Sequence, residues 1–593
     1  GGSIEASGQR AVFYLDSSGA YRSVDAMNFT QVLSASGDDL RFVAMAQNQV
    51  ATVYITSDAA SIPSRYEAVY RSFNGGDPGT WENCFRGHPG LTDPNVEAGW
   101  ITHDITWGWG GPAIGFNVNP QNPDVALFTD TGRTFLTTDA GNTWRQVYSG
   151  YAGGGAPGPG EPWSSIGLEV TSCYHYDFDP FEANRTYISY TDIGFARSQD
   201  RGDTWYHSPS GSPWTNTFYQ IVFHPTLPGV LYAACSSKHD IPFWSATGPD
   251  SDTWPGGVCR STDFGRTWTS VSNGLPDSPA TSIAVDPAAP DTLYVTMYGS
   301  GVYKSTDGAA SWLPTNNGLD IPGNSHVYSI KIHSDGTLFC SKTGYRFSGS
   351  DFYDNSGLFK SADGGNSWTS CNGAIQDIPA GQSWAWAIDF SVHPQDSTII
   401  YLGAFDCTNG RVQGGIYKTV DGGATWERKR QFYRVFYPYL DPADPDHVII
   451  TAPGSGVWES RDAGENWNEI DGIPFLTTIR ATFDPQDGET LYVATFGGGI
   501  WKRIAQPVPP VDIIYCTPDG FNVAIEWDDI THPDLDGYNV YRSIDAWEVG
   551  SARTPGELDP FRLGSAAPTT ILSAYTDVLA GSEPSYYYTV HSY

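Results

Sequence analysis

The sequence predicts an all-β protein, built as a single large β-propeller followed by a small β-sandwich. Two observations carry this prediction. An eight-residue phrase, Ser/Thr-x-Asp-x-Gly-x-Thr/Ser-Trp, returns along about 500 residues at intervals of roughly 40–65 residues. Between the copies lie short apolar runs, and the chain is rich in Gly (66) and Pro (41) but poor in Met (3), which is typical of short strands joined by many turns. Such units are stable as four-stranded blades around a channel, because each sheet buries both faces against its neighbours.

The phrase occurs in complete, altered and degenerate copies. The complete copies are Thr137–Trp144, Ser198–Trp205, Ser261–Trp268, Ser361–Trp368 and Thr419–Trp426. Two near-copies carry one change each: Ser305–Trp312 has Ala309 at the glycine position, and Ser460–Trp467 has Asn466 before the Trp. Two degenerate relatives lie upstream, around Ser72–Trp81 and Ser23–Phe29.

Each copy is predicted to form the turn of a β-hairpin. The Asp can accept hydrogen bonds from backbone N–H groups of its own turn, and the Gly supplies a backbone conformation that other residues avoid. The Trp then buries a large apolar ring between neighbouring sheets. The phrase resembles the Asp-box (BNR) repeat, which implies a β-propeller and says little about activity. The resemblance implies that five carboxylates serve their turns: Asp139, Asp200, Asp263, Asp363 and Asp421.

The propeller is expected to span residues 1–505. Counting the strand pairs gives ten units, of which the first starts near Ala11 and the last is Leu491–Arg503. The last unit has no box, so we expect it to close the ring with help from the N-terminal segment. The prediction is one ring of nine or ten blades, with eight blades as the alternative.

A proline-rich linker at 506–510 separates this ring from a C-terminal domain at 511–593. The runs Val523–Trp527, Asp536–Arg542 and Tyr586–Val590 resemble strands B, C and F of a fibronectin type III domain. The chain stops at Tyr593, before a G strand could form. Because an exposed strand edge is normally covered, we expect either further residues or a strand from a neighbouring chain or domain to complete this sandwich.

Composition limits the classes of function. The formal net charge of −34 repels phosphate backbones, so nucleic acid is not an expected partner. No run of 18 apolar residues is present, so no membrane span is expected. The eight cysteines show neither a CxxC pair nor zinc-ligand spacing, and Cys235 and Cys259 could either pair across consecutive strands or remain buried thiols. Acidity, few lysines and a modular build favour an extracellular location, secreted or on the cell surface.

Long aromatic loops mark the expected binding face. In propellers, ligands lie over the channel, among the loops that join the fourth strand to the next blade and the second strand to the third. The aromatic and charged candidates are Trp100, His103, Asp104, Trp107, Trp109, Trp163, Trp244, Tyr345, Arg346, Trp384, Trp386 and Arg434. Aromatic faces with interleaved charges suit sugar rings, which stack on them and hydrogen-bond at their edges. Alternatively, these rings only fill the loops and the contacts between blades.

Two short segments resemble glycoside hydrolase family 74, the xyloglucanases. Leu127–Arg133 is similar to the segment that carries this family's catalytic base, and Thr191–Phe195 is similar to the segment that carries its catalytic acid. Carried over, Asp130 would activate water and Asp192 would protonate the leaving oxygen. That family spreads its two acids over two seven-bladed propellers, whereas here they are expected in consecutive blades of one ring, and neither segment keeps its second Gly. Both could equally be ordinary turn aspartates.

Two functions therefore remain open. The first is an inverting glycoside hydrolase of the endo-glucanase or xyloglucanase type, acting on a neutral polysaccharide. The second is a non-catalytic adhesion, scaffold or glycan-binding module. A sialidase fits less well because no Arg-Ile-Pro segment occurs, and sortilin-type receptors follow their ring with a cysteine-rich module. No cofactor is expected, although calcium could bind in Asp-rich turns such as Asp441–Asp446.

Overall fold

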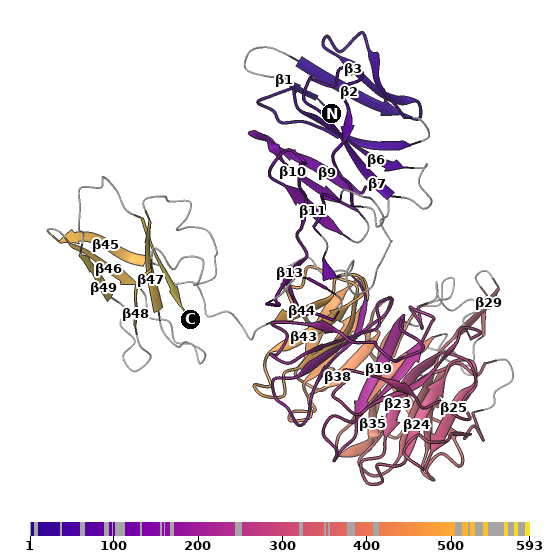
Figure 1. The fold of residues 1–593 in the computed structure, drawn as a ribbon. Coiled ribbons are helices and arrows are strands. Elements are labelled where there is room, and N and C mark those ends of the chain that lie inside the picture. Colours follow the sequence, from indigo (N-terminus) through magenta and orange to yellow (C-terminus); the bar gives the residue numbers. More distant parts are fainter. Residues whose placement is uncertain are drawn as a thin grey trace. The chain divides into compact units, whose positions relative to one another are not determined.

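A computed structural model gives the fold of the chain (Figure 1). It divides the chain into two compact units, Gly1–Lys502 and Arg503–Tyr593, and each is described by itself. The described residues are 2–4, 10–35, 38–59, 66–87, 94–97, 99–100, 113–130, 133–154, 157–158, 160–166, 171–243, 252–319, 324–348, 351–353, 356–375, 386–406, 414–503, 513–519, 522–527, 538–543, 562–566, 574–578 and 587–592. Their regular elements are β-strands, so the all-β prediction is confirmed for this part of the chain.

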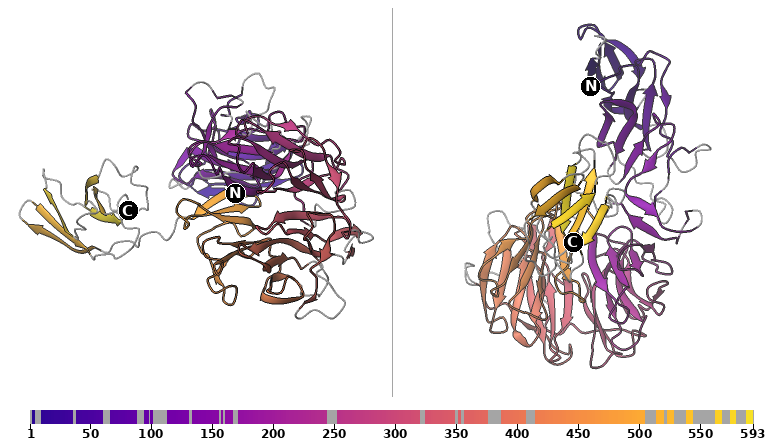
Figure 2. Two further views of the ribbon diagram at one scale, coloured as in Figure 1. Left: turned by 90° about the horizontal axis from the view of Figure 1, so that it is seen from below. Right: turned by 90° about the vertical axis from the view of Figure 1, so that its left-hand side faces the viewer.

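The larger part of the first unit is a succession of antiparallel sheets, coloured magenta to orange in Figure 1 and seen from two further directions in Figure 2. Their strands, sheet by sheet, are β15 (Cys173–Phe178), β16 (Thr186–Tyr190), β17 (Phe195–Ser198), β18 (Tyr206–His207); β19 (Thr217–Phe223), β20 (Leu231–Ser236), β21 (Gly256–Ser261), β22 (Thr269–Ser270); β23 (Ala280–Val285), β24 (Leu293–Met297), β25 (Gly301–Ser305), β26 (Leu313–Pro314); β27 (Val327–Ile332), β28 (Leu338–Lys342), β31 (Gly357–Ser361), β32 (Thr369–Ser370); β34 (Ala387–His393), β35 (Asp396–Ala404), β36 (Gly415–Thr419), β37 (Thr425–Gln431); β38 (Tyr437–Leu440), β39 (Val448–Ala452), β40 (Gly456–Ser460), β41 (Asn468–Glu469); and β42 (Thr478–Phe483), β43 (Leu491–Thr495), β44 (Ile500–Arg503). Three small strands are added to these sheets and their loops: β33 (Ala374–Ile375) beside β37, and the hairpin β29 (Tyr345–Ser348) and β30 (Asp351–Tyr353).

The described strands close a ring of seven sheets. Each first strand packs against the next sheet, and β15 of the first sheet packs against β42 and β43 of the last. The rings of Tyr176 on β15 and Tyr492 on β43 stack at this closure with centroids 4.3 Å apart. The predicted single ring of nine or ten blades, or eight, is therefore wrong. The repeat identifies a blade, but ring closure depends on contacts between sheets that are far apart in the sequence.

Three further sheets precede the ring in the chain, and they account for the surplus units. Their strands are β1 (Gly2–Ile4), β2 (Arg10–Asp16), β3 (Gly19–Ser23), β4 (Thr30–Ser34); β5 (Asp39–Ala44), β6 (Val53–Ala59), β7 (Tyr66–Ser72), β8 (Glu82–Asn83); and β9 (Gly115–Asn119), β10 (Asn122–Thr129), β11 (Thr134–Thr137), β12 (Arg145–Gln146). β2 packs on β5 and β5 on β9, as neighbouring blades do. A hairpin of β13 (Ser149–Tyr151) and β14 (Trp163–Ser165) follows them.

The repeated phrase forms the same turn wherever it is complete. In the fourth sheet of the ring, Asp363 Oδ1 accepts hydrogen bonds from Ser361 Oγ at 2.7 Å and from Ser367 N at 2.9 Å, and its Oδ2 accepts one from Ser367 Oγ at 2.6 Å. The Ser367 hydroxyl and these neighbouring donors lower the pKa of Asp363 to about 2. Asp139, Asp200, Asp263 and Asp421 accept the equivalent bonds. The predicted hydrogen-bonding role of these carboxylates is confirmed.

The direction of the strands places the loops. Because neighbouring strands are antiparallel, the loops between second and third strands lie on the same face of the ring as the loops between one blade and the next. The repeated turns, which join third to fourth strands, lie on the opposite face. We call the first of these the site face.

The second unit contains two small sheets, in the orders β45-β46-β49 and β48-β47-β50. Their strands are β45 (Ile513–Asp519), β46 (Asn522–Trp527), β47 (Tyr538–Ser543), β48 (Arg562–Ala566), β49 (Ala574–Val578) and β50 (Tyr587–Ser592). Among the described strands β50 pairs only with β47, so the C-terminal strand lies at a sheet edge. The resemblance to a fibronectin type III domain and a strand that completes it stay predictions.

The structure describes the side chains of six cysteines, and all six are free and buried. Cys235 on β20 and Cys259 on β21 lie on paired strands, where the Cys259 thiol contacts Ser212 Oγ at 3.4 Å. Of the two alternatives for this pair, buried thiols are what the structure contains.

Candidate active site on the site face of the ring

The described start of the loop after β20, residues 237–243, packs against side chains of other blades. Its Phe243 ring lies 4.6 Å from Phe496, 5.6 Å from Phe436 and 5.9 Å from Phe405, between ring centroids. These rings come from three different blades and belong to one apolar cluster that also holds Ile241. This described part of the loop is therefore anchored by packing where the blades meet.

The same anchoring fixes the two residues just before Ile241. Tyr219 donates its hydroxyl hydrogen to the carbonyl oxygen of Lys238 at 2.7 Å, and Tyr174 donates to the carbonyl oxygen of Ile241 at 2.6 Å. His239 and Asp240 lie between these two bonds, so their backbone is held on both sides. Within the pair, His239 Nδ1 lies 2.6 Å from Asp240 Oδ2.

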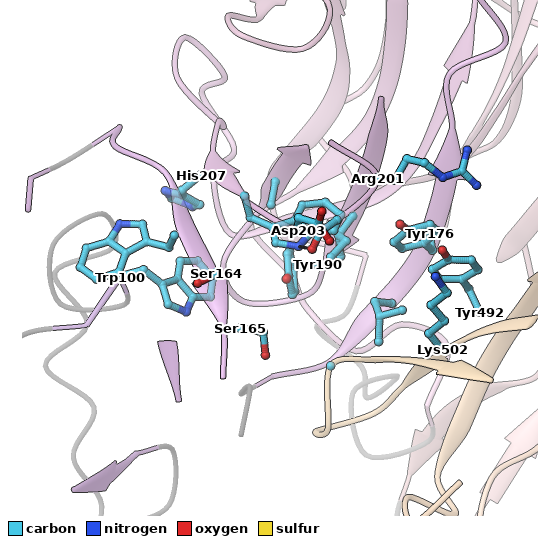
Figure 3. Close-up of a pocket in the computed structure, with 17 residues that line it drawn as sticks. Trp100, Ser164, Ser165, Tyr176, Tyr190, Arg201, Asp203, His207, Tyr492 and Lys502 are labelled. Carbon is cyan, nitrogen blue, oxygen red and sulfur yellow. Dashed lines mark hydrogen bonds between the residues drawn. The ribbon is translucent and has the colours of Figure 1, made fainter. Parts of the chain in front are cut away.

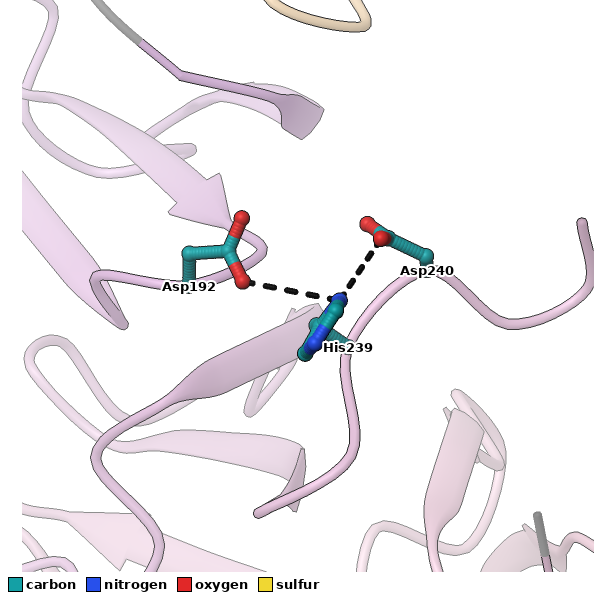
Figure 4. Close-up of side chains that lie close together, drawn as sticks. All are labelled: Asp192, His239 and Asp240. Atoms are coloured by element: carbon teal, nitrogen blue, oxygen red, sulfur yellow. Dashed lines mark hydrogen bonds and ion pairs between the residues drawn. The ribbon is translucent and has the colours of Figure 1, made fainter. Parts of the chain in front are cut away.

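Asp192 of the neighbouring blade meets this pair from the loop after β16 (Figure 4). Its Oδ1 lies 3.6 Å from His239 Nδ1. The backbone φ of Asp192 is +80°, in the left-handed region that non-glycine residues seldom occupy. Thr191, the residue before it, donates its hydroxyl hydrogen to Asp240 Oδ1 at 3.1 Å, and this hydrogen bond connects the two loops. Two loops therefore hold Asp192 in a backbone conformation that costs free energy.

Asp192, His239 and Asp240 differ in burial and in the charges that surround them. Burial raises the pKa of Asp192, and the negative charge of Asp240 raises it further, while His239 acts in the opposite direction. The hydrogen bond that His239 donates to Asp240 raises the pKa of His239. The side chains are 31% (Asp192), 44% (His239) and 20% (Asp240) exposed. The arrangement thus offers a solvent-reachable carboxyl group that retains its proton to higher pH than an ordinary Asp, beside His239 and a second carboxyl group.

The cluster could also hold a metal ion. One ligand atom from each of Asp192, His239 and Asp240 lies within 4.8 Å of the others. Oxygen and imidazole donors suit several divalent ions, but three donors leave coordination positions open. In the Asp-rich turn Asp441–Asp446, where calcium could bind, Asp441 Oδ1 accepts a hydrogen bond from Ala443 N at 2.8 Å. That carboxylate oxygen therefore stabilises its own turn.

Asp130, the predicted catalytic base, lies outside the ring. It follows β10, the second strand of its sheet, as Asp192 follows β16. The expectation that the two lie in consecutive blades of one ring is therefore wrong. The Asp130 side chain is fully buried, and its Oδ2 accepts from Arg133 Nε at 2.8 Å and forms an ion pair with Arg133 Nη2 at 2.7 Å.

The described binding candidates lie in different parts of the first unit. Trp100 and Trp163 line a cavity of about 240 Å³ beside the ring closure (Figure 3), together with Tyr190 and His207. Trp386 is fully buried in the cluster beneath Phe243, so a ligand cannot reach its ring, and its assignment to substrate binding is wrong. Arg434 stacks over Phe405 and Tyr433 at the site face.

The side chains of the remaining candidates are not among those that the structure describes. Tyr345 and Arg346 belong to β29, but their side chains are not among those described. Six candidates lie outside the described residues: His103, Asp104, Trp107, Trp109, Trp244 and Trp384.

His239 is the site residue that sequence reasoning missed. The available signal was a His-Asp pair just before a proline in the long loop that also carried Trp244. Nothing local to that loop indicates that it meets Asp192, which lies 47 residues earlier (239 − 192).

Fold and site together define a β-propeller with a carboxylate–histidine cluster on one face. No protein-family model matches the sequence, and no curated protein sequence matches it. Among solved structures, the glycoside hydrolase family 74 xyloglucanase from Xanthomonas campestris aligns with a TM-score of 0.51 and 16% identity, over 85% of this chain and 67% of that one. An ancestral enzyme of family 74 aligns with a TM-score of 0.53 and 16% identity, over 85% of this chain and 72% of that one. At this identity the likeness shows the fold, a β-propeller of the kind found in these enzymes.

Further matches include PorZ, a bacterial surface component of the type-IX secretion system of Porphyromonas gingivalis. It aligns over 98% of this chain at 13% identity, with a TM-score of 0.35. Among the described residues no helix is long and apolar enough to cross a membrane.

Proposed function

We propose that the protein is an extracellular carbohydrate-active propeller that hydrolyses a neutral polysaccharide, with Asp192 as the proton donor. The observation that carries this proposal is the geometry of Asp192: a partly exposed carboxyl on the site face, held by two loops beside His239 and Asp240. Burial and the charge of Asp240 raise its pKa, as a general acid at near-neutral pH requires. The family 74 fold supports the same class of reaction.

In the proposed step, Asp192 gives its proton to the glycosidic oxygen as the bond to the departing sugar breaks. Asp240 keeps His239 oriented and raises the pKa of Asp192, so in this step it acts on the proton donor rather than on the sugar. Asp240 is too close to be the second carboxylate of an inverting pair, since its oxygen lies within 4.8 Å of the Asp192 oxygen and such pairs are about 6.5–9.5 Å apart.

The base that activates water remains a proposal, and Asp130 is the candidate. Its position outside the ring parallels the division of the two acids between two propellers in the family that the sequence resembles. Its burial against Arg133 argues the other way, because the ion pair occupies the carboxylate oxygen that would have to contact water.

That ion pair favours the second candidate function, a glycan-binding module without hydrolysis. Such a module needs a surface that contacts sugars but no pair of catalytic carboxylates. The two functions predict different results when neutral polysaccharides are presented to the protein.

The test is release of reducing ends from a panel of plant and microbial polysaccharides, with binding measured on the same panel. Asp192→Asn should lower release by about 100-fold or more if Asp192 is the general acid. Asp277→Asn is the matched control, since Asp277 is an exposed carboxylate in a loop of the same face. Binding without release in the wild type would decide for the module, and release that survives in Asp192→Asn would remove Asp192 from the mechanism.

A second variant tests the role of Asp240. If its charge raises the pKa of Asp192, Asp240→Asn should move the alkaline limb of the pH–rate profile to lower pH while activity at acidic pH persists. An unchanged alkaline limb would contradict this assignment.

A further inference from the structure

The first strands of the seven sheets form the inner wall of the channel. Each contacts the first strand of the next sheet, in the order β15, β19, β23, β27, β34, β38 and β42, and β42 contacts β15. The side chains of these strands therefore decide what the channel can hold. Their character changes along the strands.

A β-bulge recurs on this inner wall. At Tyr174, Tyr219, Tyr328 and Ile479 the pairing of the first strand with the second strand skips one residue. A bulge adds an unpaired residue and redirects its side chain. All four side chains belong to the apolar cluster that also contains Phe243. Because the first strands begin at the site face, this cluster lies in the half of the channel nearer that face.

Beyond the bulges the inner wall is polar. A cavity of about 220 Å³ is lined there by His175 and Asp177 of β15, Gln220 of β19, Tyr437 of β38 and Arg480 of β42. Its volume equals the liquid volume of about seven waters. The cavity therefore lies further from the site face than the apolar cluster, among residues of four blades.

Polar atoms around this cavity lack hydrogen-bond partners among the described residues. Asp177 accepts no described hydrogen bond, and its one described ion pair is with His175, whose Nδ1 lies 4.0 Å from Asp177 Oδ1. Gln220 Oε1 accepts from Ser282 Oγ at 2.7 Å, so the amide nitrogen of Gln220 keeps its hydrogens to donate. The Tyr437 hydroxyl makes no described hydrogen bond. The cavity thus presents both donors and acceptors.

The charges around the cavity disfavour an ionic ligand. Lys331 Nζ lies 3.2 Å from Asp389 Oδ1, and Arg480 pairs with Asp389 Oδ2, so two cations share one carboxylate. This surplus positive charge repels a cationic ligand, and Asp177 repels an anionic ligand once it ionises. Burial lowers the pKa of His175, which is therefore neutral at pH 7. A neutral molecule with hydroxyl groups avoids both repulsions, because each hydroxyl donates and accepts.

We propose that the polar half of the channel binds a small neutral polyhydroxy compound, a polyol or a single sugar ring, through Asp177, Gln220 and Tyr437. Its hydroxyl groups donate to Asp177 and accept from the Gln220 amide and the Tyr437 hydroxyl. A cavity of about 220 Å³ admits one such molecule and not an oligosaccharide. The apolar cluster lies between this cavity and the site face, so the proposal does not rest on the hydrolase function.

Isothermal calorimetry of the full chain at pH 7.5 tests this binding, with glycerol, myo-inositol and glucose as the probes. At least one probe should bind saturably, with a dissociation constant of about 1 mM or below. Acetate and ammonium, the charged controls, should not bind. Asp192→Asn should bind the probe as the wild type does, because Asp192 lies in a loop of the site face. This variant separates the channel from the proposed active site.

Two conservative variants locate the binding in the channel. Tyr437→Phe removes one hydroxyl and Asp177→Asn removes the charge of the acceptor, and each should raise the dissociation constant about fivefold or more. Asp177→Asn loses a buried charge at this pH, so weaker binding by this variant cannot come from a less stable fold. Tyr303→Phe is the matched control and should leave binding unchanged, since Tyr303 is half-buried on β25, a third strand away from the inner wall.

A crystal soaked with the tightest probe shows directly where that probe binds. Density for the probe is expected between Asp177, Gln220 and Tyr437. No saturable binding of any probe, binding that both channel variants retain unchanged, or ordered water alone in the cavity would each overturn the proposal.

Discussion

The carboxylate of Asp177 gives a quantitative prediction about stability. It lies on β15 and lines a channel cavity of about 220 Å³, together with His175, Gln220, Tyr437 and Arg480. Its Oδ2 has no hydrogen-bond partner among the described residues. Burial raises the pKa of Asp177 to about 7, and the positive charge of Arg480 offsets only part of that rise.

The sign of the effect follows from this rise. In the unfolded chain Asp177 ionises near 3.8, whereas in the folded protein it holds its proton up to about pH 7. The stability that this group contributes is therefore fully present below pH 3.8 and is lost as the pH rises through 7. At about 1.4 kcal/mol for each factor of ten in the equilibrium constant, the rise corresponds to at most about 4 kcal/mol. Asp177→Asn cannot ionise, so it should be more stable than the wild type at pH 8.5 and similar to it near pH 4.

Urea unfolding followed by tryptophan fluorescence at pH 4, 6, 7 and 8.5 measures this difference. Asp389→Asn is the matched control in the same channel, and it should behave in the opposite way. Burial alone would raise the pKa of Asp389, but Lys331 (Nζ 3.2 Å from Oδ1) and Arg480 bring it to about 2. Its stabilising effect is therefore present above pH 3.8 and lost as the pH falls through about 2. Removing it leaves two buried cations without a counter-charge, at about 3–5 kcal/mol. Equal stability of Asp177→Asn and wild type at pH 8.5 would refute the reasoning.

Three smaller predictions concern the repeated turn, each measured by thermal unfolding. Ala309 has φ +70°, so Ala309→Gly should stabilise the protein by roughly 0.5–1 kcal/mol by removing a left-handed alanine; a lower melting temperature would contradict this. Gly365 has φ +88° and a Cβ there would lie 3.1 Å from Thr315 Oγ1, so Gly365→Ala should destabilise by roughly 1–3 kcal/mol, and a neutral effect would show that the turn adapts. Asp363→Ala removes the acceptor of two bonds from Ser367 and should lower the melting temperature, while no change would show that solvent replaces them.

The local part of the fold could be predicted because its causes lie within eight residues. The hydroxyl, carboxylate and glycine of the repeated turn satisfy one another, so the spacing in the sequence is enough to place them. Ring closure has a different cause. Tyr176 and Tyr492 are 316 residues apart (492 − 176), and nothing in either neighbourhood shows that they stack. The same limit applies to the site: Asp192 lies in a recognisable segment, but His239 reaches it only because two blades are neighbours.

A repeated architecture makes its own departures informative. At the turns the same hydrogen bonds recur from blade to blade, and there the conserved geometry is explained by stability alone. The loop after β20 departs from this regularity, since it is long and brings His239 and Asp240 to Asp192. A packed ring gains nothing in stability from charges that are partly buried in this way. The cluster of Asp192, His239 and Asp240 is therefore where binding by this protein is most directly tested.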